Sequence, residues 1–218
     1  MDKYLQIIVA ASLFRGIDPT EIVAVLKNLD AQLRVYPRNS FIWQLGEQVT
    51  SAGLVVAGSV YILREDYWGR QNILAQLGSG HLFGEVYACL PQVPLTVSVA
   101  APNGATVIFL DVKRLLAGSA RSEAENRLLH NLLLLMAERN LFLTRKMEYL
   151  TKRTTREKLL AYLSEQARLQ QSNKLILPFN RQQLADFLAV DRSAMSGELS
   201  KMQADGLIRY KKNSFELL

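Results

Sequence analysis

Proline and glycine are distributed very unevenly along this chain of 218 residues, and their distribution restricts the folds that it can adopt. Seven of the 12 glycines lie between positions 46 and 84, among Val, Ile, Tyr and Phe, whereas no proline occurs between Pro102 and Pro178. Frequent glycine in such sequence predicts short strands joined by tight turns, and a long stretch without proline permits long helices. We therefore expect an α+β fold in which a β domain comes first.

Short strands in the first half of the chain predict a jelly-roll or Greek-key β-barrel. Segments rich in β-branched and aromatic residues alternate there with turn signals. The expected strands are 33–36, 41–45, 54–63, 71–77, 95–100 and 106–110. A helix should precede them, because Asp18 can cap it, Pro19 takes its first position and Glu21 its capping-box position.

A long helix should follow the barrel, because nothing in the sequence interrupts a helix between about 121 and 150. Apolar residues recur along it at heptad spacing, with a polar interruption at Arg139 and Asn140, as in a coiled-coil seam. The expected dimer seam consists of Leu129, Leu132, Met136, Leu143, Met147 and Leu150. Because residues 132–135 are all leucine, the helix has more than one face to bury. We expect it to form a homodimer with a second copy; a helix that packs only on its own β domain is the alternative.

The last third of the chain holds nearly all of the excess positive charge. Lys and Arg exceed Asp and Glu by six in the whole chain and by five within residues 151–218. This excess favours a polyanion-binding module, although an ordinary solvated surface would also explain it. We expect an effector-sensing β domain over 1–120, a dimerisation helix over 121–150 and a DNA-binding domain over 151–218. A polar hinge should open the last part, with Thr154 and Glu157 as the capping box of the next helix.

Residues 180–206 carry the pattern of a helix-turn-helix. Asn180 can cap a first short helix, and Asp191 can cap a second helix after a tight turn at 189–190. The second helix should bury one apolar face and expose a polar one. Its apolar face consists of Met195, Leu199 and Met202.

Two strands at 207–210 and 215–218, joined by a turn at 211–214, should form the wing of a winged helix. The polar second helix suits the major groove of DNA, because only there are all base pairs distinguishable. Arg192 in its first turn can contact a guanine edge or a phosphate, and nearby basic residues can fix the register on phosphates. The candidate DNA-binding residues are Arg181, Asp191, Arg192, Ser193, Ser196, Gly197, Lys211 and Lys212. The alternative is a signal-binding module whose helix pair docks a protein partner.

The order of these parts resembles the family of the cyclic-AMP receptor protein and the fumarate–nitrate reductase regulator, the CRP/FNR family. The segments that match its recurrent motifs are 13–17 (LFRGI), 46–47 (GE), 58–60 (GSV), 83–85 (FGE), 180–185 (NRQQLA) and 191–196 (DRSAMS). The resemblance covers essentially the whole chain. It implies a homodimeric transcription factor that binds double-stranded DNA at an inverted-repeat operator, works with RNA polymerase and responds to a signal at the β domain. Because Gly197 stands where many relatives carry arginine, the operator should differ from the family's common one.

The resemblance also bears on the signal, since the residues that would bind a cyclic nucleotide differ here. In cyclic-nucleotide members a short helix after Phe-Gly-Glu holds the cyclic phosphate, and it ends in an Arg-Ser or Arg-Thr pair. That pair falls on Leu95 and Thr96, and a buried phosphate without a counter-charge is strongly destabilised. We therefore do not expect ordinary cyclic-AMP binding, although Glu85, which would hold the ribose, is retained. An uncharged or aromatic small molecule, or no ligand at all, is expected at a pocket of Gly84, Glu85, Val86, Tyr87, Leu95, Thr96, Leu143 and Thr144.

Several other functions are not expected from this sequence. The single cysteine, Cys89, excludes a disulfide framework and a four-cysteine iron–sulfur cluster. We expect neither a metal site nor haem, since His81 and His130 are typical of structural histidines. Two histidines and one cysteine form no catalytic constellation, so an enzyme is not expected. The apolar run 5–11 is too short to span a membrane and lacks a basic leader, which favours a cytoplasmic protein without a membrane partner.

Overall fold

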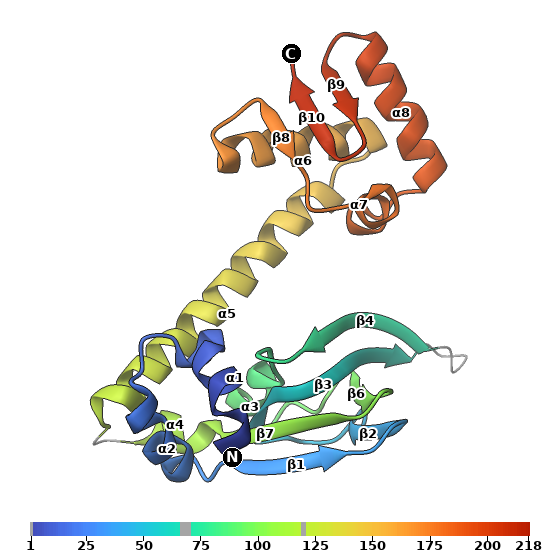
Figure 1. Ribbon diagram of the computed structural model, residues 1–218. Coiled ribbons are helices and arrows are strands. Elements are labelled where there is room, and N and C mark those ends of the chain that lie inside the picture. Colours follow the sequence, from blue (N-terminus) through green and yellow to red (C-terminus); the bar gives the residue numbers. More distant parts are fainter. Residues whose placement is uncertain (1, 66–70, 119–120) are drawn as a thin grey trace. The chain divides into compact units, whose positions relative to one another are not determined.

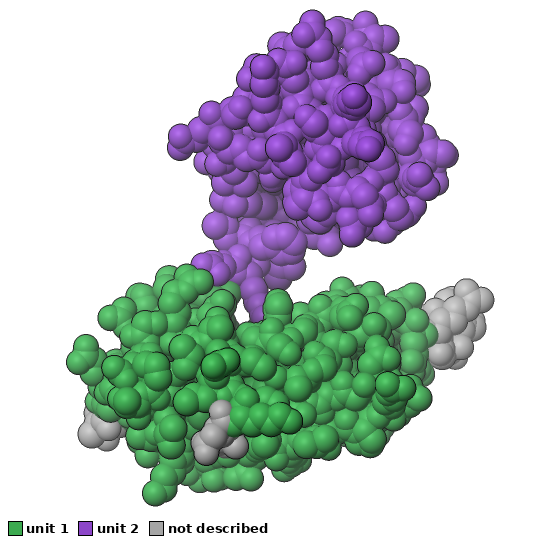
Figure 2. Space-filling model, in the orientation of Figure 1, with its two compact units in different colours: residues 1–137 green, residues 138–218 purple. Residues whose placement is uncertain are grey.

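The computed structural model describes residues 2–65, 71–118 and 121–218, and Figure 1 shows its helices and strands. The chain forms two compact units, residues 1–137 and 138–218 (Figure 2). The boundary between the units falls within a single helix, α5 (Glu123–Leu150). Within the described residues, none of the helices combines the length and apolar character that crossing a membrane requires.

Seven antiparallel strands form a β-roll in the described part of the first unit. The longest is β3 (Ser51–Glu65), which pairs with β7 and β5 along its first half and with β4 and β6 along its second. Two register shifts interrupt its ladders: Val56 is an extra residue of β3 opposite β7, which lets β3 bend there, and Leu74 is an extra residue of β4 opposite β3. The other strands are β1 (Gln32–Tyr36), β2 (Ser40–Trp43), β4 (Gln71–Gly78), β5 (Leu82–Phe83), β6 (Ser98–Ala101) and β7 (Ala105–Asp111). All six expected strands are present, although β6 begins three residues later than expected.

Short helices accompany the roll, and α1, α2 and α4 gather beside the start of α5 (Figure 1). The bounds are α1 (Leu5–Ala10), α2 (Pro19–Asn28), α3 (Glu85–Cys89) and α4 (Val112–Ala117), with 3₁₀ turns at Asp2–Tyr4 and Ser12–Phe14. Helix α2 begins as expected, with Asp18 as its cap and Pro19 at its first position. The Asp18 carboxylate accepts bonds from the amide and hydroxyl of Thr20, at 2.8 and 2.6 Å, rather than bonding Glu21.

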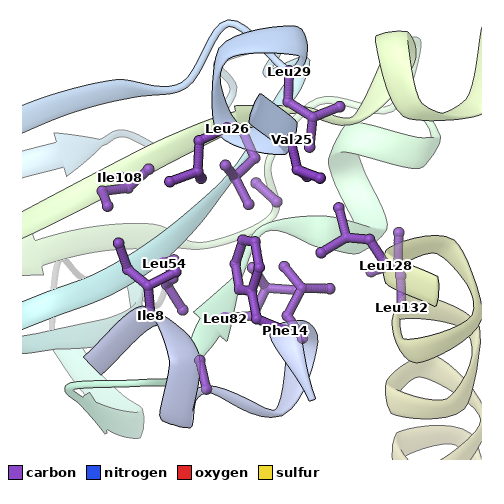
Figure 3. Close-up of a cluster of buried hydrophobic side chains, with 14 of the residues drawn as sticks. Ile8, Phe14, Val25, Leu26, Leu29, Leu54, Leu82, Ile108, Leu128 and Leu132 are labelled. Atoms are coloured by element: carbon purple, nitrogen blue, oxygen red, sulfur yellow. The ribbon is translucent and has the colours of Figure 1, made fainter. Parts of the chain in front are cut away.

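The main core of the first unit lies between these helices, the roll and the first turns of α5 (Figure 3). The buried side chains that meet there include Ile8, Phe14, Leu26, Leu54, Ile108, Leu128 and Leu132. Because Leu132 is only 3% exposed in this core, the prediction that it belongs to the dimer seam is wrong. The neighbouring Asn131 amide donates to the carbonyl oxygens of Leu13 and Arg15, at 2.9 and 2.8 Å. These bonds fix that face of α5 toward its own domain.

The second unit is a winged helix built on the C-terminal part of α5. Its elements are α6 (Thr155–Gln170), β8 (Lys174–Ile176), α7 (Arg181–Leu188), α8 (Arg192–Ala204), β9 (Ile208–Lys211) and β10 (Ser214–Leu217). Helix α6 starts at the expected capping box of Thr154 and Glu157, and β9 and β10 form the expected wing. Strand β8 was not expected; it pairs with β10, about forty positions later, and completes a three-stranded sheet. The predicted jelly-roll domain, long helix and winged helix-turn-helix are thus confirmed.

Candidate nucleic-acid interface

Helices α7 and α8 meet at the tight turn that the sequence predicts. Asn180 and Gln183 cap α7 reciprocally, each backbone amide donating a 2.9 Å bond to the side-chain oxygen of the other residue. The helix ends at Ala189, whose φ of +49° is left-handed and costs about 1 kcal/mol for a residue that carries a Cβ atom. Ala185 is fully buried in the core that also holds Met195 of α8. The small alanine side chain leaves room for the two helices to pack closely.

Asp191 fixes the start of α8. Its Oδ1 accepts a 2.8 Å bond from the amide of Ala194 and a 2.5 Å bond from the hydroxyl of Ser193. These bonds favour the ionised carboxylate and lower the pKa of Asp191. Two of the candidate DNA-binding residues, Asp191 and Ser193, therefore bond each other and place the exposed Arg192 in the first turn.

The exposed face of α8 carries small polar side chains behind this arginine. Arg192 and Gly197 are exposed and Ser196 is partly exposed, whereas the expected apolar face is fully buried. The Ser196 hydroxyl donates to the carbonyl oxygen of Arg192 at 2.9 Å, and Ser200 donates likewise to Ser196 at 3.1 Å. Because the hydroxyl protons of Ser196 and Ser200 are used in these bonds, their oxygens can act toward DNA only as hydrogen-bond acceptors.

Two exposed residues on this side of α8 were left out of the candidate set. They are Ser200, four residues after Ser196, and Gln203, three residues after Ser200, and this helical spacing is the sequence signal that places them there. Gln203 also accepts a 3.3 Å bond from the backbone amide of Tyr210 in the wing. The exposed polar face of α8 thus extends beyond Gly197 to Gln203.

The wing presents cations beside α8. Lys211 and Lys212 are exposed at the tip of the β9–β10 hairpin, where Lys212 adopts a left-handed φ of +55°. The hydroxyl oxygens of Tyr210 and Ser200 lie 3.3 Å apart, which joins the hairpin to α8. Arg209 and Lys174 are further exposed cations of this sheet that the sequence analysis missed, each 3.9 Å from Glu216.

The Arg181 side chain is partly enclosed by aromatic rings and is not free in solvent. Its guanidinium lies 4.7 Å from the ring centre of Tyr210 and 4.9 Å from that of Phe215. Burial among these rings lowers the pKa of Arg181. The side chain therefore ties the start of α7 to the wing, and its contact with phosphate stays a prediction.

An indole covers the start of α3, where the sequence analysis placed the effector pocket. Gly84 precedes α3 with a left-handed φ of +74°, and a Cβ atom at this position would lie 2.3 Å from the Trp43 ring. The Trp43 ring packs edge-on against Phe83, with 5.1 Å between centres, and lies 5.5 Å from Phe109. Only glycine fits at position 84, and Trp43 is a contributor to this site that sequence reasoning missed.

The structure places six of the predicted pocket residues together in the first unit. Glu85 and Leu95 are buried, Val86 is exposed, and the hydroxyls of Tyr87 and Thr96 lie 2.6 Å apart in a hydrogen bond. The other two, Leu143 and Thr144, are exposed residues of the second unit. The first-unit members thus lie on or beside α3, with Glu85 and Leu95 buried and Val86 and Thr96 exposed.

Two family models match this chain. The Crp-like helix-turn-helix domain matches residues 157–218, which include α7, α8 and the wing. The cyclic nucleotide-binding domain matches residues 33–121, which include the strands of the β-roll except for Gln32, the first residue of β1. The two matches follow each other in the order that the sequence analysis expected.

Similar proteins extend over most of the chain. The cyclic AMP receptor protein of Thermus thermophilus is 26% identical over 205 residues, which cover 94% of this chain and 91% of that protein. The CRP-like protein Clp of Xanthomonas campestris is 24% identical over 181 residues, 80% of this chain and 79% of its own.

Solved structures share the fold. The catabolite activator protein of T. thermophilus matches with a TM-score of 0.57 and 24% identity, over 95% of this chain and 94% of that one. The c-di-GMP responsive global regulator CLP of X. campestris matches with a TM-score of 0.53 and 23% identity, over 92% and 99% of the two chains. Fold, motifs and relatives agree: this chain is a DNA-binding transcription regulator and belongs to the CRP/FNR family.

Proposed function

We propose that this regulator acts as a homodimer whose two α8 helices bind the half-sites of an inverted-repeat operator. The exposed polar face of α8, which begins at Arg192 beside the lysine-tipped wing, is the observation that carries the proposal. In the major groove Arg192 would contact a guanine edge or a phosphate, while Lys211 and Lys212 would contact phosphates. Two such helices related by a two-fold axis fit successive major grooves, about 34 Å apart. RNA polymerase is then the partner through which transcription responds.

An exposed apolar stripe along α5 supports the homodimer. Leu133, Leu143 and Met147 are 59%, 57% and 64% exposed, and large apolar side chains in one stripe favour a partner. Leu133 takes the seam position that Leu132 was expected to fill. The corrected seam consists of Leu129, Leu133, Met136, Asn140, Leu143, Met147 and Leu150, at alternating spacings of four and three. This is heptad spacing, in which a single Asn specifies the register of a pair at some cost in stability.

The β domain, in this proposal, responds to an uncharged or aromatic small molecule or to no ligand. The T. thermophilus relative is named for cyclic AMP and the X. campestris regulator is described as responsive to c-di-GMP. Here Leu95 stands where a phosphate-binding arginine is expected, and Trp43 covers the first turn of α3. A cyclic phosphate would therefore meet apolar groups instead of a cation. An effector that binds better to one conformation would increase the population in which both α8 helices fit the operator.

DNA binding with and without Arg192 tests the proposal. Arg192→Ala should weaken operator binding about tenfold or more and leave binding to a random duplex nearly unchanged, because it removes a base contact. Lys211→Ala is the matched control, and it should weaken both duplexes equally because it removes a phosphate contact. Fluorescence anisotropy with both duplexes provides the two affinities.

The salt dependence of the same measurement separates DNA binding from protein docking. Several phosphate contacts predict that the logarithm of the affinity falls steeply with the logarithm of salt concentration. Equal losses on both duplexes for Arg192→Ala would restrict this residue to phosphate contact. A wild-type protein that ignores both duplexes at low salt would contradict operator binding and favour the protein-docking alternative.

A further inference from the structure

A forked ion pair joins α6 to α8, on the side of α8 that lies away from its exposed polar face. The Arg156 guanidinium donates through Nε to Oε1 of Glu198 at 2.5 Å and through Nη2 to Oδ2 of Asp205 at 2.7 Å. Arg156 is the second residue of α6, directly after the polar segment that ends α5, whereas Glu198 lies in α8 and Asp205 is its C-terminal cap. We call these three residues the Arg156 fork.

Helical spacing shows which side of α8 the fork holds. Glu198 and Asp205 are seven residues apart, so they lie on one side of the helix and two turns from each other. Ser196 and Ser200, on the exposed polar face, point about half a turn away from them at 100° per residue. A single planar side chain thus contacts the back of α8 at two points along its axis.

We infer that Arg156 is a positioning residue that sets the orientation of α8 for reading the operator. Two contacts two turns apart restrict both the tilt of α8 and its rotation about its own axis, which one contact would leave free. Arginine suits this role, because its fork is rigid and can bond two carboxylates at once. Base contacts are more sensitive to such a rotation than phosphate contacts, because they need bonds of defined direction. The inference rests on the proposed binding of α8 to DNA and names a residue that acts behind it.

The competing role for Arg156 is contact with a DNA phosphate. Substitutions of its two carboxylate partners distinguish this role from the positioning of α8. Replacing Glu198 with Gln and Asp205 with Asn removes two negative charges from the DNA-binding unit. If Arg156 and its surroundings act only through charge, this double variant should bind every duplex more tightly. If the fork positions α8, the same variant should bind the operator more weakly while its affinity for a random duplex stays equal or rises. The two roles therefore predict opposite signs for the operator.

The matched control is Glu165→Gln within α6. Glu165 bonds the Arg168 guanidinium at two points, 2.6 and 2.9 Å, so the substitution also breaks a forked pair and removes one negative charge. The Arg168 pair lies within α6, and Glu165 also lies 3.4 Å from Arg145 of α5, so neither contact involves α8. Glu165→Gln should therefore leave the preference for the operator over a random duplex unchanged.

The experiment uses the full-length chain and an operator selected with the wild-type protein. We expect the Glu198→Gln, Asp205→Asn variant to lose about tenfold or more of its operator preference, a loss typical of residues in one ion-pair network. Arg156→Lys keeps the positive charge but can bond only one of the two carboxylates well, so its operator preference should fall by an intermediate amount. This variant provides the test if the double variant folds poorly. Amide hydrogen exchange should be faster in α8 and unchanged in α6.

Two outcomes would overturn the inference, and they can be told apart. An unchanged operator preference in both fork variants, with the wild type still selective, refutes the role of Arg156 alone. A wild type without operator preference refutes the proposed function and this inference with it.

Discussion

Gly197 is the residue where α8 departs most from what a DNA-reading helix needs for its own stability. A Cβ atom at this position meets no heavy atom within 4 Å, so a side chain is sterically free to occupy it. Glycine inside a helix costs about 1 kcal/mol relative to alanine. Packing within the described residues therefore does not require glycine at this position. We expect Gly197 to affect which DNA bases α8 can contact.

Substitutions at Gly197 should therefore change operator choice without harm to folding. Gly197→Ala should raise the free energy of unfolding by about 0.5–1 kcal/mol and leave the selected operator unchanged. Gly197→Arg adds a forked donor to the exposed face and should change the base preferred at one position of each half-site. Thermal unfolding and operator selection measure the two effects. A loss of stability in the alanine variant would show that Gly197 is needed for the fold.

Tyr162 should make the second unit sensitive to alkaline pH. Burial, with a smaller effect of Tyr149, raises the pKa of its phenol to about 12, whereas an unfolded tyrosine has a pKa of about 10. Below pH 10 both states keep the proton, so the stabilisation is fully present. Between pH 10 and 12 the unfolded state ionises first, and up to about 3 kcal/mol of the free energy of unfolding is lost.

Tyr162→Phe should remove this component of the alkaline loss. Denaturant unfolding at pH 9, 10, 11 and 12 compares the two proteins, and lysines that titrate in the same range affect both equally. The difference between them should grow above pH 10. Parallel curves over the whole range would contradict a raised pKa for Tyr162.

At the residue scale, the sequence could predict the interactions that each residue makes with residues a few positions away in the chain. The caps at Asp18, Thr154, Asn180 and Asp191 were all predicted, because each bonds within its own first turn. The cover of Trp43 over Gly84 was not predicted, because it joins positions 41 residues apart in a folded core. Residues whose role depends on tertiary packing need the structure.

At the element scale, α5 has two apolar faces, and the sequence assigned one leucine to the wrong face. Leu132 and Leu133 are adjacent and both fit a heptad within the tolerance of the pattern. Only burial separates them: Leu132 lies in its own core, whereas Leu133 is exposed. The dimer proposal therefore depends on Leu133.

Lysine substitutions on α5 should separate these faces experimentally. Leu133→Lys places a charge in the proposed seam and should raise the dimer dissociation constant about tenfold or more. Leu134→Lys is the matched control, because Leu134 is also exposed but lies off the stripe by about 100°. Sedimentation equilibrium gives the dissociation constants. Equal effects of the two substitutions would place the dimer contact elsewhere.

Short elements limit what a sequence can predict at this scale. Strand β5 has two residues and β8 has three, too few to show the alternation of a strand. Each is held by a partner distant in sequence, β3 for β5 and β10 for β8. The longer strands and α5 were predicted because their own sequence carries the pattern.

At the scale of the whole molecule, the two units have separate cores that agree with the uneven sequence. The glycine-rich half forms the β-roll core, and the basic last third forms the core beneath α7 and α8. The candidate DNA-binding residues share the second unit, as expected, and the corrected seam lies on the helix that contains the boundary between the units. The effector could not be predicted, because it depends on side chains such as Trp43 that meet only in the folded roll.

Selection of bound fragments from a genomic library tests the central proposal most directly. Full-length protein should enrich DNA that carries two inverted half-sites with centres about 10–10.5 base pairs apart, the spacing of one helical turn. The two-fold symmetry of the enriched sequence would reflect the paired α8 helices. Enrichment of a single unrepeated site, or of no sequence at all, would contradict a dimer that reads an operator through α8.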